Sequence, residues 1–265
     1  SVGLTTVFGV LGVLNFAHGS FFMLGAYFGM QSVKIFNSFW FGLIFGPIIV
    51  VAIGFLTEFF LLRKVYSRSV TFQLLLTFAL LLVIDDSVRM VWGSGYHVVD
   101  PPEILSGRVV LFGQEYPIYR IFLIVAGVLM GFGLWSFFRF TRFGKIVRAA
   151  SFDREMAEGV GINVPIVFTS VFLLGSWLAA LGGVLAAPQQ SLNPSMGEKI
   201  IIESFIVVVV GGMGSFPGAL VGAILLGMLE SFGTVFAGNL QMALPYLLLS
   251  VILIFKPNGL FKKGV

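Results

Sequence analysis

The sequence has no cysteine and little charge, and both shortages restrict what the protein does. Without cysteine, disulfide bonds and thiolate metal sites are excluded. Charged residues make up 11% of the 265 residues, whereas a soluble domain carries about 25%. The alternating segments of about ten residues that mark membrane barrels are also missing. These shortages point away from a soluble domain, a disulfide scaffold and a barrel.

Signs of enzyme chemistry are equally scarce. The chain contains two histidines, and we find no nucleophile–base pair and no metal-ligand spacing. The phosphate-binding pattern G-x-x-x-x-G-K-[ST] does not occur, so the chain does not bind ATP through a loop of this type. We therefore expect a protein that is not an enzyme and has neither metal nor cofactor.

Long apolar runs dominate the chain instead. Hydrophobic residues make up 58% of it, with 30 Phe and 33 Gly, and glycine is commoner in membrane helices than in soluble ones. The sequence predicts an all-α, polytopic membrane helical bundle forming a single transmembrane domain over residues 1–265. Because the first apolar run begins at once, we expect a further N-terminal helix to precede it. The expected membrane segments are 2–14, 19–33, 40–62, 70–92, 118–138, 166–187, 200–236 and 240–256.

Lysine and arginine orient these segments. If the segments alternate in direction, eleven basic residues fall on one side: Arg63, Lys64, Arg68, Arg139, Arg142, Lys145, Arg148, Arg154, Lys256, Lys262 and Lys263. The other side has Lys34, Arg108, Arg120 and Lys199. The excess marks the cytoplasm, so residues 139–165 and the C-terminus are expected inside and residues 93–117 outside. The stretch 109–118 is expected to form a short strand or hairpin. Because the basic residues lie at the ends of apolar segments, membrane orientation explains them better than nucleic-acid binding does.

Residues 14–25, "LNFAHGSFFMLG", place polar side chains in an apolar run. A helix break at membrane depth is tolerated only against protein or a water-filled path. We expect Asn15 to cap a helix or bond freed carbonyls, Gly19 to allow a positive φ, and Ser20 to cap a helix over 21–33. Such a helix N-terminus suits a carboxylate. Asn15, His18, Gly19 and Ser20 either line a solute path or only repair the break. His18 is expected as a hydrogen-bonding partner rather than a metal ligand or proton carrier.

Residues 211–218, "GGMGSFPG", predict a second break. Four glycines and a proline end one helix and begin the next. The residues expected there are Gly211, Gly212, Gly214, Ser215 and Pro217, as path lining or as a tight packing turn. Both breaks share Gly-Ser-Phe followed by a Gly-Ala pair, which indicates an internal repeat or a chance match. Interrupted apolar segments at corresponding positions in the two halves of a chain are typical of transport sites built from discontinuous helices.

Ionisable residues inside membrane segments are functional candidates by default. They are Glu58, Asp85, Asp86, Arg89, Glu203 and Glu230. We favour structural roles for them. Asp85 and Asp86 lie four and three residues before Arg89, the spacing of ion pairs on one helix face, and Glu58 lies near Arg63 at a segment end. Glu203 lies near an interface, and Glu230 is the most isolated.

The most informative polar stretch is residues 139–165. Its part "RAASFDREMAEGVG" (148–161) predicts a short amphipathic helix with mixed charges, ended by Gly159 and Gly161, and Pro165 opens the next segment. A rigid charged helix is more than membrane orientation requires. The alternative is a positive-inside loop with incidental helix.

Several motifs in this order resemble one family over nearly the whole chain. They are "NFAHG" with "MLGAY" (15–19 and 23–27), "RA-x-x-x-D-x-x-x-A-x-x-x-GIN" (148–163), "GG-x-GS-x-PGA-x-x-G" (211–222) and "P-x-GLF" (257–261). The sequence resembles the permease subunits of ABC importers for branched-chain amino acids and related solutes. Family members usually have one more helix before "GLTTVFG".

The resemblance implies that residues 139–165 are a coupling segment that docks on a cytoplasmic ATPase. The residues that match the family motif there are Arg148, Ala149, Asp153, Ala157, Gly161, Ile162 and Asn163. It also implies a second related permease subunit, two ATPase subunits that bind the ATP, a periplasmic solute-binding protein, membrane lipid around the helices, and a bacterial inner-membrane location. Branched-chain or other amino acids are the expected solutes, with urea, amides and small carboxylates as alternatives. An ion-coupled secondary transporter and a passive channel are the competing hypotheses.

Overall fold

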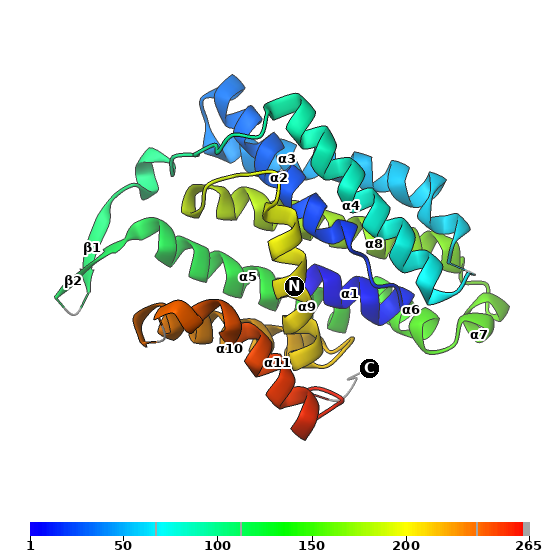
Figure 1. Cartoon of the computed structure of the whole chain (residues 1–265). Helices are drawn as coiled ribbons and strands as arrows, with labels where there is room; N and C mark the ends of the chain where they lie inside the picture. Colours follow the sequence, from blue (N-terminus) through cyan, green and yellow to red (C-terminus); the bar gives the residue numbers. More distant parts are fainter. Residues whose placement is uncertain (67, 112, 237, 262–265) are drawn as a thin grey trace.

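The computed structural model describes residues 1–66, 68–111, 113–236 and 238–261 (Figure 1). The α-helices in this part are α1 Val2–Leu11, α2 Ala17–Phe36, α3 Phe39–Phe60, α4 Val70–Trp92, α5 Ile118–Phe140, α6 Arg142–Phe152, α7 Arg154–Gly159, α8 Val164–Ala186, α9 Met196–Gly211, α10 Phe216–Phe236 and α11 Leu244–Phe255. The 3₁₀ turns are Leu62–Lys64, Glu103–Leu105, Ala187–Gln189 and Gly238–Ala243. The strands are β1 Arg108–Leu111 and β2 Gln114–Pro117. The expected helical bundle is confirmed.

Four helical stretches in the described residues are long and apolar enough to cross a membrane. They are Phe39–Lys64, Ile118–Phe140, Val164–Gln189 and Phe216–Phe236. Helix α4 has a full 23 residues, but Asp85, Asp86 and Arg89 lower its apolar character. Its predicted membrane segment is therefore a helix of the right length with a polar stretch in its second half.

The centre of the bundle is α2, which packs most extensively on α3 and α8. Phe21, Met23 and Tyr27 of α2 are fully buried there. Small residues bring the backbones together: a Cβ on Gly25 would lie 2.3 Å from the carbonyl oxygen of Ala180 on α8. Lipid provides no hydrophobic force between helices, so close van der Waals contact of this kind holds membrane helices together.

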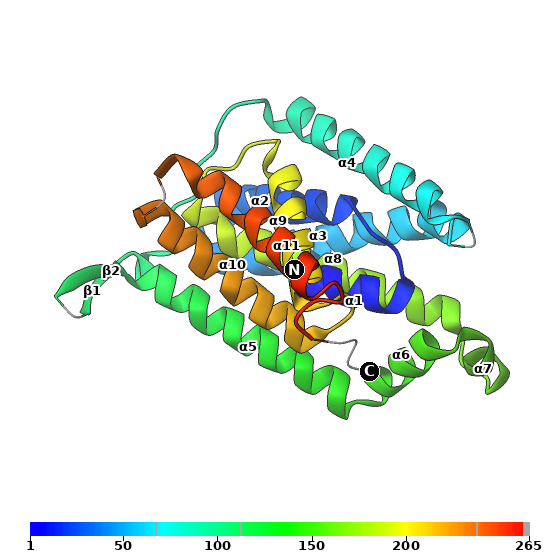
Figure 2. The same ribbon diagram turned by 60° about the horizontal axis from the view of Figure 1, so that its bottom comes forward.

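The two ends of the bundle differ. The β1–β2 hairpin lies at one end and α6 and α7 at the other, in both views (Figures 1 and 2). The hairpin is antiparallel, with Val109 opposite Tyr116. This confirms the hairpin expected over 109–118. Lys262 and Lys263, counted for the orientation, lie outside the described residues.

Candidate functional site

The first break comprises residues 12–16, between α1 and α2. Gly12 has φ 67°, which ends α1 in a left-handed turn. Asn15 is buried, and its Oδ1 accepts a hydrogen bond from the Ala17 N–H at 3.1 Å. The Thr77 hydroxyl of α4 lies 3.3 Å from the freed Leu14 carbonyl and 3.1 Å from the Leu74 carbonyl of its own helix, and its one proton is shared between them. Asn15 thus bonds one backbone N–H at the start of α2, while its Nδ2 has no partner among the described residues, and α4 contributes a second contact to the break.

Helix α2 begins at Ala17, so Gly19 and Ser20 lie inside its first turns. The prediction that Gly19 adopts a positive φ is wrong. Instead, a Cβ at Gly19 would lie 2.1 Å from the Gly197 carbonyl oxygen, because α9 crosses α2 against this residue. The glycine is needed for helix–helix approach rather than for a turn.

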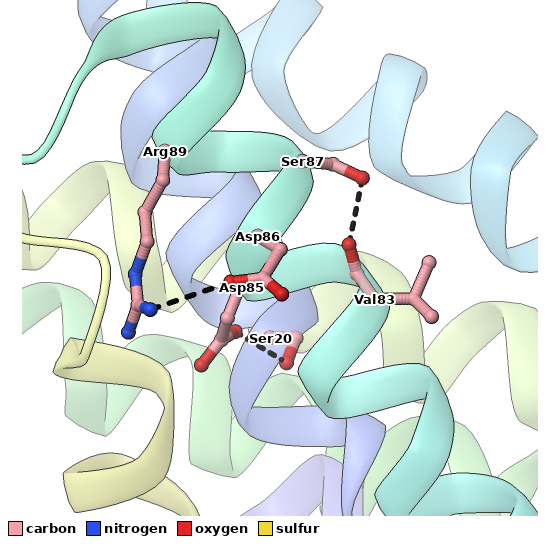
Figure 3. A network of polar contacts seen from close by, with 6 residues as sticks. All are labelled: Ser20, Val83, Asp85, Asp86, Ser87 and Arg89. Carbon is pink, nitrogen blue, oxygen red and sulfur yellow. Dashed lines mark hydrogen bonds and ion pairs between the residues drawn. The ribbon is translucent and has the colours of Figure 1, made fainter.

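Ser20 was also expected as a helix cap, and this is wrong because the helix has already begun three residues earlier. Its hydroxyl donates to Oδ1 of Asp85 on α4 at 3.1 Å (Figure 3). Ser20 is fully buried and Asp85 is 2% exposed. The hydroxyl therefore links α2 to the polar stretch of α4.

His18 is 4% exposed, and its Nδ1 has no hydrogen-bond partner among the described residues. The expected hydrogen-bonding role at the break is therefore not supported for this atom. The ring lies against Gly3 of α1 and lines a cavity of about 490 Å³. Elements α1, α2, α5, α8, α9 and α10 form this central cavity, and its polar lining includes Glu203, Ser204 and Glu230. Of the predicted path residues, His18 alone is in its lining.

The second break comprises residues 212–215 and forms where the glycines predicted it. Gly212 and Gly214 have φ 103° and 81°, and α10 begins at Phe216 with Pro217 as its second residue. Ser215 is buried, and its Oγ accepts the Gly218 N–H at 3.2 Å. The local Gly-Ser-Phe structure differs from that of the first break, because Ser20 is within its helix and Ser215 precedes one.

The C-terminal motif closes this second break, a contact that sequence reasoning missed. The N–H groups of Leu260 and Phe261 donate to the carbonyls of Val210 and Gly211 at 2.9 and 3.1 Å. These carbonyls belong to the last turn of α9, which leaves its acceptors without partners inside the helix. The "P-x-GLF" sequence was the available signal, since it follows α11 and returns the chain to α9.

A second cavity, of about 790 Å³, joins the second break to the coupling segment (residues 139–165). Gly214 and Pro217 line it, together with Arg148 of α6 and Thr5 and Thr6 of α1. Of these two cavities, His18 of α2 lines the central one, and Gly214 and Pro217 line the second.

The coupling segment folds as two helices, α6 and α7, rather than the one expected over 148–161. Asp153 separates them, because its extended backbone ends α6 and its Oδ1 caps α7 by accepting the Met156 N–H at 2.9 Å. Gly161, with φ 86°, lies in the turn after α7, and Asn163 caps α8 by accepting the Ile166 N–H at 3.3 Å. Pro165 opens α8 as predicted.

The motif residues of this segment divide into an inner and an outer set. Ala157 is buried against the N-terminal half of α8, and Arg148 donates to the Phe138 carbonyl of α5. Ile162 is half-buried. The exposed set is Ala149, Asp153, Gly161 and Asn163. The inner residues fix the segment to the bundle, and the outer ones are available to a partner.

The acids in the membrane segments are partly paired as expected. Asp86 pairs with Arg89 at 3.3 Å, and Glu203 with Lys199 at 3.5 Å. Asp85 does not pair with Arg89 but faces Ser20, and its Oδ2 has no partner among the described residues (Figure 3). Glu58 accepts hydrogen bonds from two hydroxyl groups and forms no ion pair with Arg63 in the described part of the chain. The Arg63 guanidinium stacks 5.8 Å from the Phe59 ring centre.

Known proteins and a family model are similar to this chain over nearly its whole length. Residues 1–255 match the family model described as the permease component of branched-chain amino acid transport systems. The high-affinity branched-chain amino acid permease BraD of Pseudomonas aeruginosa is 30% identical over 98% of this chain and 89% of its own. LivH of Escherichia coli K12, with the same description, is 26% identical over the same shares. The fructose import permease FrcC of Rhizobium meliloti is 33% identical over 44% of this chain and 35% of its own.

No solved structure matches the chain. The family match and the BraD similarity both extend over nearly all the described helices, both helix breaks and the coupling segment. The chain therefore belongs to the family of permease components of branched-chain amino acid transport systems.

Proposed function

We propose that the chain is the membrane-spanning permease subunit of a binding-protein-dependent ABC importer. It passes a small solute into the cytoplasm and hydrolyses no ATP itself. The observation that carries this proposal is the family match over residues 1–255 together with a coupling segment built as two packed helices. A secondary transporter or a channel has no need of such a segment.

The proposed assembly follows from that role. Two cytoplasmic ATPase subunits bind the exposed side of α6 and α7, and a second related permease completes a heterodimeric membrane core. A periplasmic binding protein delivers solute to the opposite end, where the hairpin lies. The chain then sits in a bacterial inner membrane with its C-terminus inside. Binding of loaded binding protein and ATP shifts the access state only through their different affinities for the two states.

Branched-chain amino acids are the proposed solutes, because the relatives BraD and LivH carry that description. Other amino acids, urea, short amides and small carboxylates are the alternatives. The two helix breaks are the proposed points where the path meets irregular backbone, since such backbone is tolerated at membrane depth only against protein or a water-filled path. The proposed path residues near the first break are Asn15, His18, Gly19 and Ser20. Those at the second break are Gly211, Gly212, Gly214, Ser215 and Pro217.

Uptake into proteoliposomes tests the proposal. The chain is reconstituted with its second permease, ATPases and binding protein, and radiolabelled leucine is added outside with ATP inside. We expect uptake that requires ATP and the binding protein. Leucine uptake driven by a Na⁺ or H⁺ gradient with the chain alone would establish the secondary transporter instead, and downhill leakage without either would establish a channel. A ligand screen of the cognate binding protein identifies the solute.

A further inference from the structure

Glu58 lies near the end of α3 and is 0% exposed. Its Oε2 lies 3.0 Å from the Thr169 hydroxyl of α8, whose one proton is shared with the Pro165 carbonyl of the same helix, also at 3.0 Å. Its Oε1 accepts a hydrogen bond from the Tyr66 hydroxyl at 3.3 Å. Burial and the neighbouring Glu58 raise the pKa of Tyr66, so this hydroxyl stays protonated and donates. One carboxylate thus joins three parts of the chain: α3, α8 and the α3–α4 corner (residues 61–66).

The Tyr66 ring extends this network to the coupling segment. It packs edge-on against Phe168 of α8, with ring centres 6.1 Å apart at 88°. The Arg154 guanidinium of α7 lies 5.5 Å from the centre of the same Phe168 ring. Phe168 also belongs to the buried cluster that α6, α7 and α8 share, which includes Ala157. A displacement of α7 therefore moves Phe168 first, and Phe168 in turn displaces Tyr66.

The α3–α4 corner is tied to α4 as well. Gln73 is buried in the first turns of α4, and its amide nitrogen lies 3.1–3.3 Å from the carbonyl oxygens of Val65, Tyr66 and Arg68, so its two N–H groups are shared among three acceptors. Three carbonyls held by one side chain fix the path of the corner. Whatever displaces Tyr66 is therefore transmitted to both α3 and α4.

A buried carboxylate in a membrane helix is costly, and a leucine would fill this position without that cost. Arg63, the nearest cation in sequence, stacks on Phe59 and forms no ion pair with Glu58 in the described part of the chain. The two hydroxyls satisfy the carboxylate while holding α8 and the corner in one arrangement. On the basis of the proposed function, we propose that Glu58 is a positioning residue that fastens the α3–α4 corner to α8, so that movement of the coupling segment reaches α3 and α4.

The test measures leucine uptake and ATP hydrolysis on the same proteoliposomes, with the complete transporter. Glu58→Leu removes both links. Glu58→Gln keeps them, because the amide oxygen accepts one hydroxyl and the amide nitrogen donates to the other. The matched control is Ser170→Ala, since this hydroxyl on the same helix as Thr169 donates to the Ile166 carbonyl of its own helix. A double variant, Tyr66→Phe with Thr169→Val, removes the two hydroxyls at nearly constant volume.

We expect Glu58→Leu and the double variant to hydrolyse ATP within twofold of the wild type but to move at least tenfold less leucine per ATP. Glu58→Gln and Ser170→Ala are expected to keep the wild-type ratio within twofold. A merely structural role would lower both activities together and leave the ratio unchanged, and that result in the double variant overturns the proposal even if Glu58→Leu does not fold. If the wild type itself shows no ATP-driven uptake, the proposed function fails, which is a distinct result.

Discussion

The hydroxyl of Ser20 on α2 donates a hydrogen bond to Oδ1 of Asp85 on α4 at 3.1 Å, across 65 positions of sequence (Figure 3). The bond connects the helix that begins at the first break to the edge helix of the bundle. It is the one side-chain partner of Asp85 in the described part of the chain, because Oδ2 has none. The stability of the α2–α4 contact therefore depends on Ser20.

Ser20→Ala should lower the stability of the folded bundle. Loss of the hydroxyl leaves a buried carboxylate with no donor, which costs about 1–3 kcal/mol. Ser87→Ala is the matched control, because Ser87 is an exposed residue of α4 that donates to the Val83 carbonyl of its own helix. Thermal melting in detergent, followed by tryptophan fluorescence, compares the two. Equal melting temperatures for both variants would contradict a role for the bond.

Gly19→Ala should disturb the packing of α2 against α9. The added methyl group would lie 2.1 Å from the Gly197 carbonyl oxygen and 2.8 Å from Cβ of Ile201. Neither the backbone nor a β-branched side chain yields easily, and overpacking of this kind costs about 1–3 kcal/mol or more. Gly127→Ala on α5 serves as the control, since a Cβ there meets no atom within 4 Å. We expect a lower folded yield and melting temperature for Gly19→Ala alone, and a wild-type melting temperature would refute the close contact.

The helices and the second break were predictable because local features determine them. Apolar runs of about 20 residues define membrane helices, and the run 200–236 divides at Gly212 and Gly214, which adopt the positive φ that glycine allows. The short hairpin followed from its place between two apolar segments. In each case the decisive information lies within a few residues of the feature itself.

Contacts between distant segments were not predictable in this way. "Gly-Ser" at 19–20 is typical of a turn, but α9 and α4 pack against these two residues, so tertiary contact accounts for both and the turn lies earlier. Thr169 is 111 positions from Glu58, and no local pattern links them. The pairing of Leu260 with Val210 likewise depends on how α11 returns the chain to α9.

Gly161 should be essential for coupling because of its backbone. Its φ of 86° lies in the left-handed region, which costs most other residues about 1–2 kcal/mol. Gly161→Trp adds this strain and a large side chain on the exposed surface of the coupling segment. We expect ATP-driven leucine uptake to fall at least tenfold while the affinity of the binding protein for leucine is unchanged.

Gly161→Asn separates backbone strain from bulk, since asparagine tolerates the left-handed region. We expect it to keep most of the uptake. Normal uptake by the Trp variant would count against this segment as the contact to the ATPase. Equal losses in both variants would contradict backbone strain as the cause, because asparagine tolerates the left-handed region.

Asp153→Ala should loosen α7 without unfolding the bundle. The carboxylate caps this helix by accepting the Met156 N–H, and loss of a cap of this kind costs about 1 kcal/mol. That change corresponds to about fivefold faster hydrogen exchange at the Met156 amide, measurable by mass spectrometry of peptides covering α7. Asp153→Asn is the control, because its amide oxygen accepts the same bond and the Met156 amide should keep the wild-type exchange rate.

If both variants exchange at the wild-type rate yet both lose ATP-driven uptake, Asp153 contacts the ATPase directly and its capping role is dispensable. If only the alanine variant exchanges faster and loses uptake, the ATPase requires an ordered α7.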